Sequence, residues 1–292
     1  MPKSQRLAFL LFLPLITFTG YLYVAVPSCN QFAGGCYGLH TTILSHTAPA
    51  PYAYRYLAPF LVGALSQANL FIGYAALHLI CFALLYPALY TWLSRYLSIE
   101  RTFAALLIMA LGFWLGFHFW YFSPWSTLEI TLVCLALAWM DKPFALYAGL
   151  TLLASLNRET GILLAFIYIA YHFESKSLWR YMTLLLIYGL AQIGLTAIVG
   201  IVPQYMSLEN NLRGNLMLLP ETLLANLPLL PIAFLIAVNF KRSKPVFKRL
   251  ALIACGYSGA VLFGAVWQEF PRLVLSVLPL VLPVIVEGEN GM

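Results

Sequence analysis

Two stretches of the chain, 103–122 and 181–202, contain no Asp, Glu, Lys or Arg. Each is long enough to cross the hydrocarbon core of a bilayer, which takes about 20 apolar residues in a helix. Only 9% of the 292 residues are charged, against about 25% in a typical soluble domain. No polar segment approaches the size of a domain. The sequence therefore predicts an all-α, polytopic helical membrane protein, with 1–292 forming a single transmembrane domain and no soluble domain.

The apolar runs predict about nine or ten helices. Helices are expected at 7–26, 70–93, 103–122, 126–140, 181–202, 222–239, 250–267 and 272–286. A short interfacial or re-entrant helix is expected at 55–66, and outer loops at 27–54 and 203–221. The basic N-terminus resembles that of a signal peptide, but no small-residue cleavage site is evident before residue 26. We therefore expect it to be a retained first helix.

The motif "NRET", residues 157–160, lies between two half-length apolar runs, 144–156 and 161–172. Each run is too short to span a bilayer, so we expect a broken pair of half-helices that enters the membrane and returns. Non-helical backbone at such a depth is tolerated only inside protein or beside a water-filled cavity. The motif places Arg158 and Glu159 side by side, and ionisable residues within the membrane commonly mark functional sites.

The basic residues predict the orientation. With the N-terminus in the cytoplasm, 12 of the 16 Lys and Arg residues fall in cytoplasmic segments, as the positive-inside rule requires. The net charge of +6 then reflects topology, and no nucleic-acid partner is expected. The four remaining basic residues lie on the outer side or within the membrane, and all are arginines: Arg55, Arg158, Arg213 and Arg272. Arginine offers a rigid fork that binds carboxylate or phosphate through two hydrogen bonds.

Four charged stretches approach the predicted outer face. They are "PYAYRYLAPF" (51–60), "STLEI" (126–130), "NRET" and "WQEFPRL" (267–273). We expect them to line one outward-facing cavity that binds an anionic head group, most simply a phosphate at the membrane surface. The candidate residues of this site are Arg55, Arg158, Arg272, Glu129, Glu159, Glu269, Asn157 and Tyr54.

The same charges are also compatible with a polar network that only holds helices together. Arg158 and Glu159 would point about 100° apart on a helix, so each is expected to pair with a residue elsewhere, such as Arg272 or Glu269. Glu269 and Arg272 also have the i, i+3 spacing of an ordinary interfacial pair. Arg213, in the second outer loop, fits a solvated surface charge. The aromatic residues nearby fit either the interfacial aromatic belt or stacking on sugar rings.

Other classes of site have little support in the sequence. No HExxH motif or Cys/His spacing indicates a metal site, so no cofactor is expected, and a divalent cation has no motif to support it. No Walker, GxSxG or glycine-rich nucleotide motif is present, so any activated donor is expected to be lipid-linked. Cys29 and Cys36 lie in the predicted first outer loop, where an oxidising compartment favours a disulfide between them.

Three motifs resemble the multi-pass GT-C-type glycosyltransferases, especially their small bacterial members. They are "YAYRYLAPF" after the first outer loop, "LASLNRETGILL" after two short helices, and "FPRLVLSVLPLVLP" near the C-terminus. The resemblance implies residence in a bacterial inner membrane, and transfer of a sugar from a polyprenyl-phosphate carrier at the outer face. Such enzymes usually carry an acidic residue in the first outer loop, whereas 27–54 contains none and the only aspartate is Asp141.

Two functions follow from these observations. In the first, a polyprenyl-phosphate-linked sugar enters from the bilayer. The arginines expected to hold its phosphate are Arg158, Arg272 and Arg55, and the candidates for the general base are Glu129, Glu159 and Glu269. In the second, the protein is not an enzyme but a lipid or saccharide transporter, or a non-catalytic membrane subunit of a larger complex. The missing acid in 27–54 is compatible with that second function.

Overall fold

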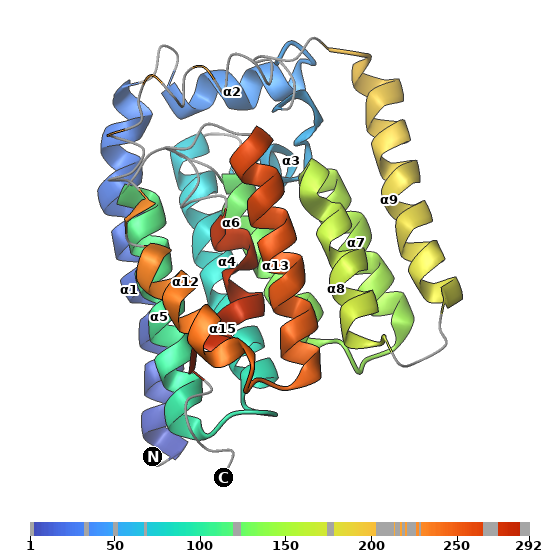
Figure 1. Cartoon of the computed structure of the whole chain (residues 1–292). Helices are drawn as coiled ribbons and strands as arrows, with labels where there is room; N and C mark the ends of the chain where they lie inside the picture. The colour runs from blue at the N-terminus through green and yellow to red at the C-terminus, as the bar shows by residue number, and fades with distance from the viewer. Residues whose placement is uncertain are drawn as a thin grey trace.

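The computed structural model describes residues 3–31, 35–48, 52–66, 69–118, 124–173, 178–202, 226–227, 229–264 and 274–286, with the single positions 213, 217 and 220. Within these residues the regular structure is entirely helical (Figure 1). The all-α prediction is therefore confirmed.

Twelve α-helices are present in the part of the chain so described. They are α1 (Lys3–Gln31), α2 (Gly35–Leu44), α3 (Leu57–Leu65), α4 (Leu70–Leu93), α5 (Ile99–His118), α6 (Pro124–Ala138), α7 (Phe144–Asn157), α8 (Leu163–Tyr171), α9 (Leu178–Val199), α12 (Leu229–Phe240), α13 (Pro245–Gly264) and α15 (Leu278–Val286). Three short 3-10 helices accompany them: η1 (Tyr52–Tyr54), η2 (Glu159–Ile162) and η4 (Leu275–Val277).

The helix boundaries differ from the hydropathy prediction where a helix begins with polar residues. The bounds of α4 coincide with the predicted run, and the Asn69 side chain caps its start by accepting a hydrogen bond from the Ile72 amide at 3.2 Å. In contrast, α5 and α13 each begin several residues before the predicted apolar run. The segment 27–54, expected to be a loop, contains the end of α1, all of α2 and η1. Hydropathy marks where apolar surface begins, whereas backbone hydrogen bonding decides where a helix begins.

Among the residues that the structure describes, three helices are long and apolar enough to cross a membrane. They are Ser4–Tyr23 within α1, Leu70–Leu93 and Leu178–Val199. These three helices differ in how much of their surface is covered by the rest of the protein. Helix α4 lies in the centre of the bundle, whereas α9 lies at its edge (Figure 1).

The ends of α4 and α8 and the starts of α9 and α13, which carry many of the basic residues, lie at the end of the bundle where α1 begins, labelled N in Figure 1. Arg95 Nη1 lies 2.9 Å from Asp141 Oδ2, and Lys244 Nζ lies 5.6 Å from the ring centroid of Tyr96. Arg249 Nε donates to the Ala170 carbonyl at 2.8 Å. These contacts join the end of α4, the α6–α7 and α12–α13 connections, and the end of α8. We call this side of the bundle the basic end.

The half-helices on either side of "NRET" form an antiparallel hairpin. Tyr147 Oη on α7 donates to the Leu164 carbonyl on α8 at 2.7 Å, and the rings of Phe144 and Tyr168 lie 5.7 Å apart. The break falls at Arg158, whose extended backbone (φ −163°, ψ 151°) ends α7. The predicted interruption at 157–160 is confirmed, and the turn of this hairpin points away from the basic end (Figure 1).

The turn closes only because residue 161 is glycine. A Cβ atom there would lie 2.5 Å from the Ser155 nitrogen and 2.7 Å from the Ala154 oxygen, both backbone atoms that cannot rotate away. The Gly161 amide also donates to the Arg158 carbonyl at 3.0 Å. Residue 161 packs directly against the backbone at the end of α7, so no side chain fits at this position.

We expect Gly161→Ala to lower the stability by about 1–3 kcal/mol, because the added methyl group forces the turn apart. Gly194→Ala is the matched control, since a Cβ at that position on α9 meets nothing within 4 Å, and alanine is the better helix former. Thermal unfolding of both variants in detergent checks the difference. Equal melting temperatures would show that the turn does not need its glycine.

Candidate functional site

Four charged side chains form one connected network, which we call the ion network: Arg55, Glu129, Arg158 and Glu159. Arg158 Nη1 lies 3.0 Å from Glu129 Oε2, and the two side chains are only 5% and 2% exposed. Arg158 Nε also lies 3.4 Å from Glu159 Oε1. Burying an ion pair this deeply costs several kcal/mol of desolvation free energy per ion. The surrounding helices must therefore hold the two side chains in good geometry and supply further hydrogen bonds.

Glu129 is the fully satisfied member of the network. Its Oε2 accepts hydrogen bonds from Arg158 Nη1 and, at 3.0 Å, from Ser276 Oγ on η4. Its Oε1 accepts from the Thr160 hydroxyl. Ser126, one helical turn before Glu129 on α6, accepts from Arg158 Nη1 at 3.1 Å. Both carboxylate oxygens of Glu129 therefore have partners, and three separate parts of the chain meet at this side chain.

Arg55 holds Glu159 through two hydrogen bonds. Arg55 Nη2 donates to Glu159 Oε1 at 2.8 Å and Arg55 Nε donates to Oε2 at 3.4 Å. The guanidinium carbon of Arg55 lies 4.9 Å from the Tyr52 ring centroid and 5.5 Å from that of Trp125. Cation–π contacts of this kind hold a guanidinium in place without using its N–H groups. Arg55 is thus oriented in advance toward an anion.

Glu159 is the only member of the network that is substantially exposed. Its side chain is 39% exposed, whereas that of Arg55 is 6% exposed. Two guanidinium groups, from Arg55 and Arg158, converge on its carboxylate. The network therefore has a closed side at Glu129 and an accessible side at Glu159.

Two hydrogen bonds place the network beside the interior of a candidate span. On α9, Tyr188 Oη donates to the Glu159 carbonyl at 3.0 Å and Gln192 Nε2 donates to the Ser155 carbonyl at 2.8 Å. Beyond Gln192, α9 continues for about two turns, or roughly 10 Å, to its end. Two residues after Glu129 on α6, Thr131 donates to the carbonyl of Cys81, in the middle of α4, at 3.4 Å. The charges therefore lie alongside the inner parts of α4 and α9, not at their ends.

Asn157 and Tyr54, both predicted to bind substrate, make structural contacts here. Asn157 is fully buried, and its Nδ2 donates to the Trp125 carbonyl at 2.7 Å. Asn157 Oδ1 and Trp125 Nε1 are buried and have no hydrogen-bond partner among the described residues. Tyr54 Oη donates to the Gly200 carbonyl at 3.1 Å and accepts from the Val202 amide at 3.3 Å, which fixes the end of α9.

Two of the predicted site residues, Glu269 and Arg272, lie outside the described residues, and their roles stay predictions. The same holds for the disulfide between Cys29 and Cys36, because the backbone of each belongs to a helix but their side chains are not described. Sequence reasoning missed Ser276, Tyr188 and Gln192. Ser126 and Thr160 fall inside the motifs "STLEI" and "NRET", so the signal for them was present.

No group of three His, Cys, Asp or Glu side chains that could hold a metal ion occurs within the described part of the chain. Comparison with protein-family models, with curated proteins and with solved structures found no match to this chain. The resemblance to GT-C-type glycosyltransferases therefore rests on the three sequence motifs alone.

Replacing Arg158 with alanine should lower the free energy of unfolding by about 3–5 kcal/mol, because it leaves the Glu129 carboxylate buried without its charged partner. Asp141→Asn is the control: it breaks the Arg95–Asp141 pair at the surface, where the Asp141 side chain is 60% exposed. That loss should be under about 1 kcal/mol. Thermal unfolding in detergent measures both.

The double variant Arg158→Met/Glu129→Leu removes both buried charges at once, and we expect it to recover most of the stability that Arg158→Ala loses. A double variant as unstable as the single one would contradict the assignment of Glu129 as the partner of Arg158.

Proposed function

We propose that the chain is a polytopic integral membrane protein of a bacterial inner membrane with its N-terminus in the cytoplasm. Three helices of sufficient length and hydropathy support this topology. The gathering of Lys and Arg at the basic end supports the orientation, because cytoplasmic segments of membrane proteins are enriched in these residues. The turn of the α7–α8 hairpin then points toward the periplasm.

We further propose that the ion network binds the phosphate of a lipid-linked sugar, and that the protein transfers this sugar at the outer side of the membrane. The observation that carries the proposal is the convergence of Arg55 and Arg158 on one accessible carboxylate within a membrane protein. Two guanidinium groups around one anion form the arrangement that best binds phosphate. Intramembrane charges are expensive and are retained chiefly where they act on a ligand.

In this reaction an acceptor hydroxyl attacks the anomeric carbon of the donor sugar. The bond from that carbon to the phosphate oxygen breaks, and polyprenyl phosphate leaves with the electron pair. Arg55 and Arg158 stabilise the negative charge on the leaving phosphate. The acceptor proton goes to a carboxylate, for which Glu159 is the better candidate, because the oxygens of Glu129 are already occupied.

The pairing of Glu159 with two arginines bears directly on its role as a base. A carboxylate held by two cations binds a proton weakly. When a phosphate takes over the Arg55 fork, the Glu159 carboxylate is released from one of its cations and becomes a stronger base. Phosphate binding and base activation are therefore coupled in the proposed mechanism.

The second candidate function is a non-catalytic one, as a transporter of lipids or saccharides or as a membrane subunit of a larger complex. It is favoured by the closed pairing of the network, in which both described carboxylates already have arginine partners. Broken helices near the middle of the membrane also occur in transporters. A measurement of catalytic turnover distinguishes the two functions, because only the transferase releases polyprenyl phosphate when an acceptor is present.

The lipid-binding step is tested by mass spectrometry of lipids that remain bound through gentle purification. We expect polyprenyl phosphate, or its sugar-linked form, to be enriched on the wild type and reduced about tenfold or more on Arg55→Gln, since a charge-assisted hydrogen bond contributes about 1.5–3 kcal/mol. Arg95→Gln, at the basic end, should retain the lipid. Ordinary phospholipids alone on all three proteins would refute the phosphate site.

The chemical step is tested with Glu159→Gln in proteoliposomes that contain polyprenyl-phosphate-linked sugars extracted from bacterial membranes. We expect acceptor-dependent release of polyprenyl phosphate by the wild type, and a loss of about 100-fold or more in the variant, the usual effect of removing a general base. Wild-type protein that binds the lipid without releasing polyprenyl phosphate would favour the transporter or subunit function.

A further inference from the structure

A tyrosine hydroxyl beside the ion network takes no part in its hydrogen bonds. Tyr257 lies on α13, and its Oη atom is buried without a hydrogen-bond partner among the described residues. Leaving a buried polar group unpaired is unfavourable, so such groups are rare in folded proteins. The hydrogen of this hydroxyl is therefore available to an acceptor that comes within reach.

Tyr257 lies among the charges of the network. The charged side chains that act on its hydroxyl are Glu129, Arg158 and Glu159, and Ser276 lies beside it. Ser276 donates its own hydrogen to Glu129 Oε2 at 3.0 Å. A carboxylate accepts hydrogen bonds, whereas a guanidinium only donates them. The first candidate acceptor for Tyr257 is therefore the Glu129 carboxylate, beside Ser276.

The fold brings this hydroxyl to the network from the direction of the basic end. Helix α13 packs against α8, α15 and η4. Near its start, Arg249 Nε donates to the Ala170 carbonyl at the end of α8. Tyr257 follows about two turns later, or roughly 12 Å farther along the helix axis. Tyr257 therefore reaches the closed side of the network, where Glu129 lies.

Glu129 depends on a single cation. Among the described residues its one ionic partner is Arg158, and Thr160 and Ser276 add neutral hydroxyl donors. Arg158 is also one of the two guanidinium groups of the proposed phosphate site. A buried carboxylate that loses its cation is strongly destabilised. An anion that draws Arg158 away from Glu129 therefore requires a replacement donor at this carboxylate.

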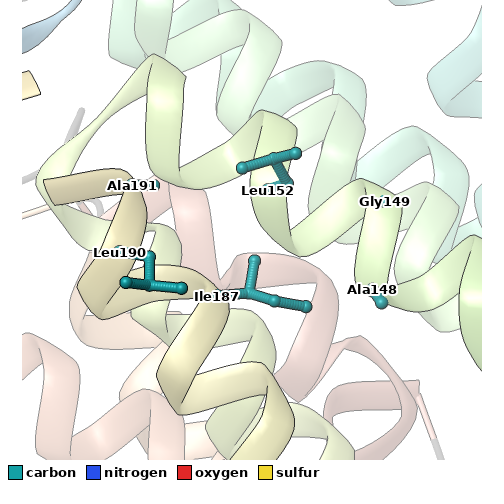
Figure 2. Close-up of a pocket in the computed structure, with 6 residues that line it drawn as sticks. All are labelled: Ala148, Gly149, Leu152, Ile187, Leu190 and Ala191. Atoms are coloured by element: carbon teal, nitrogen blue, oxygen red, sulfur yellow. The ribbon is translucent and has the colours of Figure 1, made fainter. Parts of the chain in front are cut away.

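The pocket between α7 and α9 supplies no such donor. Figure 2 shows the residues that line it, none of which has a polar side chain: Ala148, Gly149, Leu152, Ile187, Leu190 and Ala191. Tyr257, in contrast, is an uncommitted donor that already lies beside Glu129.

We propose that Tyr257 is the reserve donor of the ion network: when an anion engages the Arg158 guanidinium, the Tyr257 hydroxyl donates to Glu129 in its place. The inference rests on the proposed function, because the phosphate of that function is the anion that competes for Arg158. Tyr257 acts through Glu129 and is a positioning residue. A hydrogen bond to a carboxylate is about twice as strong as one between neutral groups, so this hydroxyl stabilises the bound state selectively.

The first test compares Tyr257→Phe in two backgrounds by thermal unfolding in detergent. In the wild type the substitution should leave the melting temperature unchanged, because the hydroxyl has no partner to lose. In Arg158→Ala, where Glu129 has lost its cation, the same substitution should lower the melting temperature by a further 5 °C or so, roughly the effect of one hydrogen bond to a charged group. Tyr90→Phe is the matched control, since it removes the same atom from a ring on α4 that packs 5.8 Å from Phe103, and its effect should be equal in both backgrounds.

The second test measures the binding of farnesyl phosphate, a short prenyl phosphate, from the rise in melting temperature with its concentration. Tyr257→Phe should bind it about tenfold more weakly than the wild type, because the bound state loses a charge-assisted hydrogen bond that the free state does not make. Tyr90→Phe should bind it with the affinity of the wild type.

If Arg158→Ala does not fold, Glu129→Gln serves as the second background. A neutral amide accepts a weaker hydrogen bond than a carboxylate. In Glu129→Gln, the loss of farnesyl phosphate affinity caused by Tyr257→Phe should therefore shrink to about twofold or less. A tenfold loss that persists in this background would show that Tyr257 does not act through Glu129, and would overturn the proposal.

The outcomes separate the reserve donor from the phosphate site. Equal effects of Tyr257→Phe in the wild-type and Arg158→Ala backgrounds, or wild-type affinity for farnesyl phosphate in Tyr257→Phe, would overturn the reserve donor and leave the phosphate site standing. No binding of farnesyl phosphate by the wild type, with the difference between the backgrounds intact, would overturn the phosphate site and leave the donation from Tyr257 to Glu129 standing. Destabilisation of the wild type by Tyr257→Phe would show that the hydroxyl is already bonded, for example to an ordered water, and would overturn the proposal.

Discussion

The buried pair of Arg158 and Glu129 is the interaction on which the rest of the site depends. Each ion loses several kcal/mol of hydration energy when it is buried, and the pair repays this loss only with good geometry and additional hydrogen bonds. The chain supplies them from distant segments: Ser126 on α6, Thr160 in the turn and Ser276 on η4. The extended backbone at Arg158 and the glycine at 161 are the local conditions that bring these groups together.

The two sides of the ion network differ in how fully their carboxylates are enclosed, and the proposal assigns a structural role to one side and a ligand-facing role to the other. On the closed side, Glu129 has partners for both oxygens and joins α6, the turn and η4. On the accessible side, Glu159 keeps 39% of its side chain exposed, while Arg55 is held against two aromatic rings. The buried pair fixes the position of Arg158, and so also the position of the second guanidinium group that faces Glu159.

Sequence patterns predicted the parts of this structure that depend on local information. A continuous apolar run located α4, and the interrupted run located the turn at Arg158 and Glu159. Pairing across the fold was not accessible in the same way. The structure pairs Arg158 with Glu129 and Glu159 with Arg55, which no local pattern indicates. The expected partners Arg272 and Glu269 lie outside the described residues, so that part of the prediction stays untested. Ser276 lies inside the stretch "FPRLVLSVLPLVLP", but nothing in that stretch indicates its bond to Glu129, which spans 147 positions and exists only through tertiary packing. The starts of α5 and α13 escaped the hydropathy prediction because charged residues (Glu100 and Arg101; Lys248 and Arg249) interrupt their apolar residues.

The depth of the network gives the proposed chemistry its physical advantage. The charges lie about two helical turns inside the end of α9, where the surroundings are apolar and electrostatic interactions are stronger than in water. Two arginines in such a place stabilise a leaving phosphate more effectively than they would at the membrane surface. The broken helix thus brings the charges alongside the inner parts of α4 and α9, which is the position that the proposed lipid-linked donor requires.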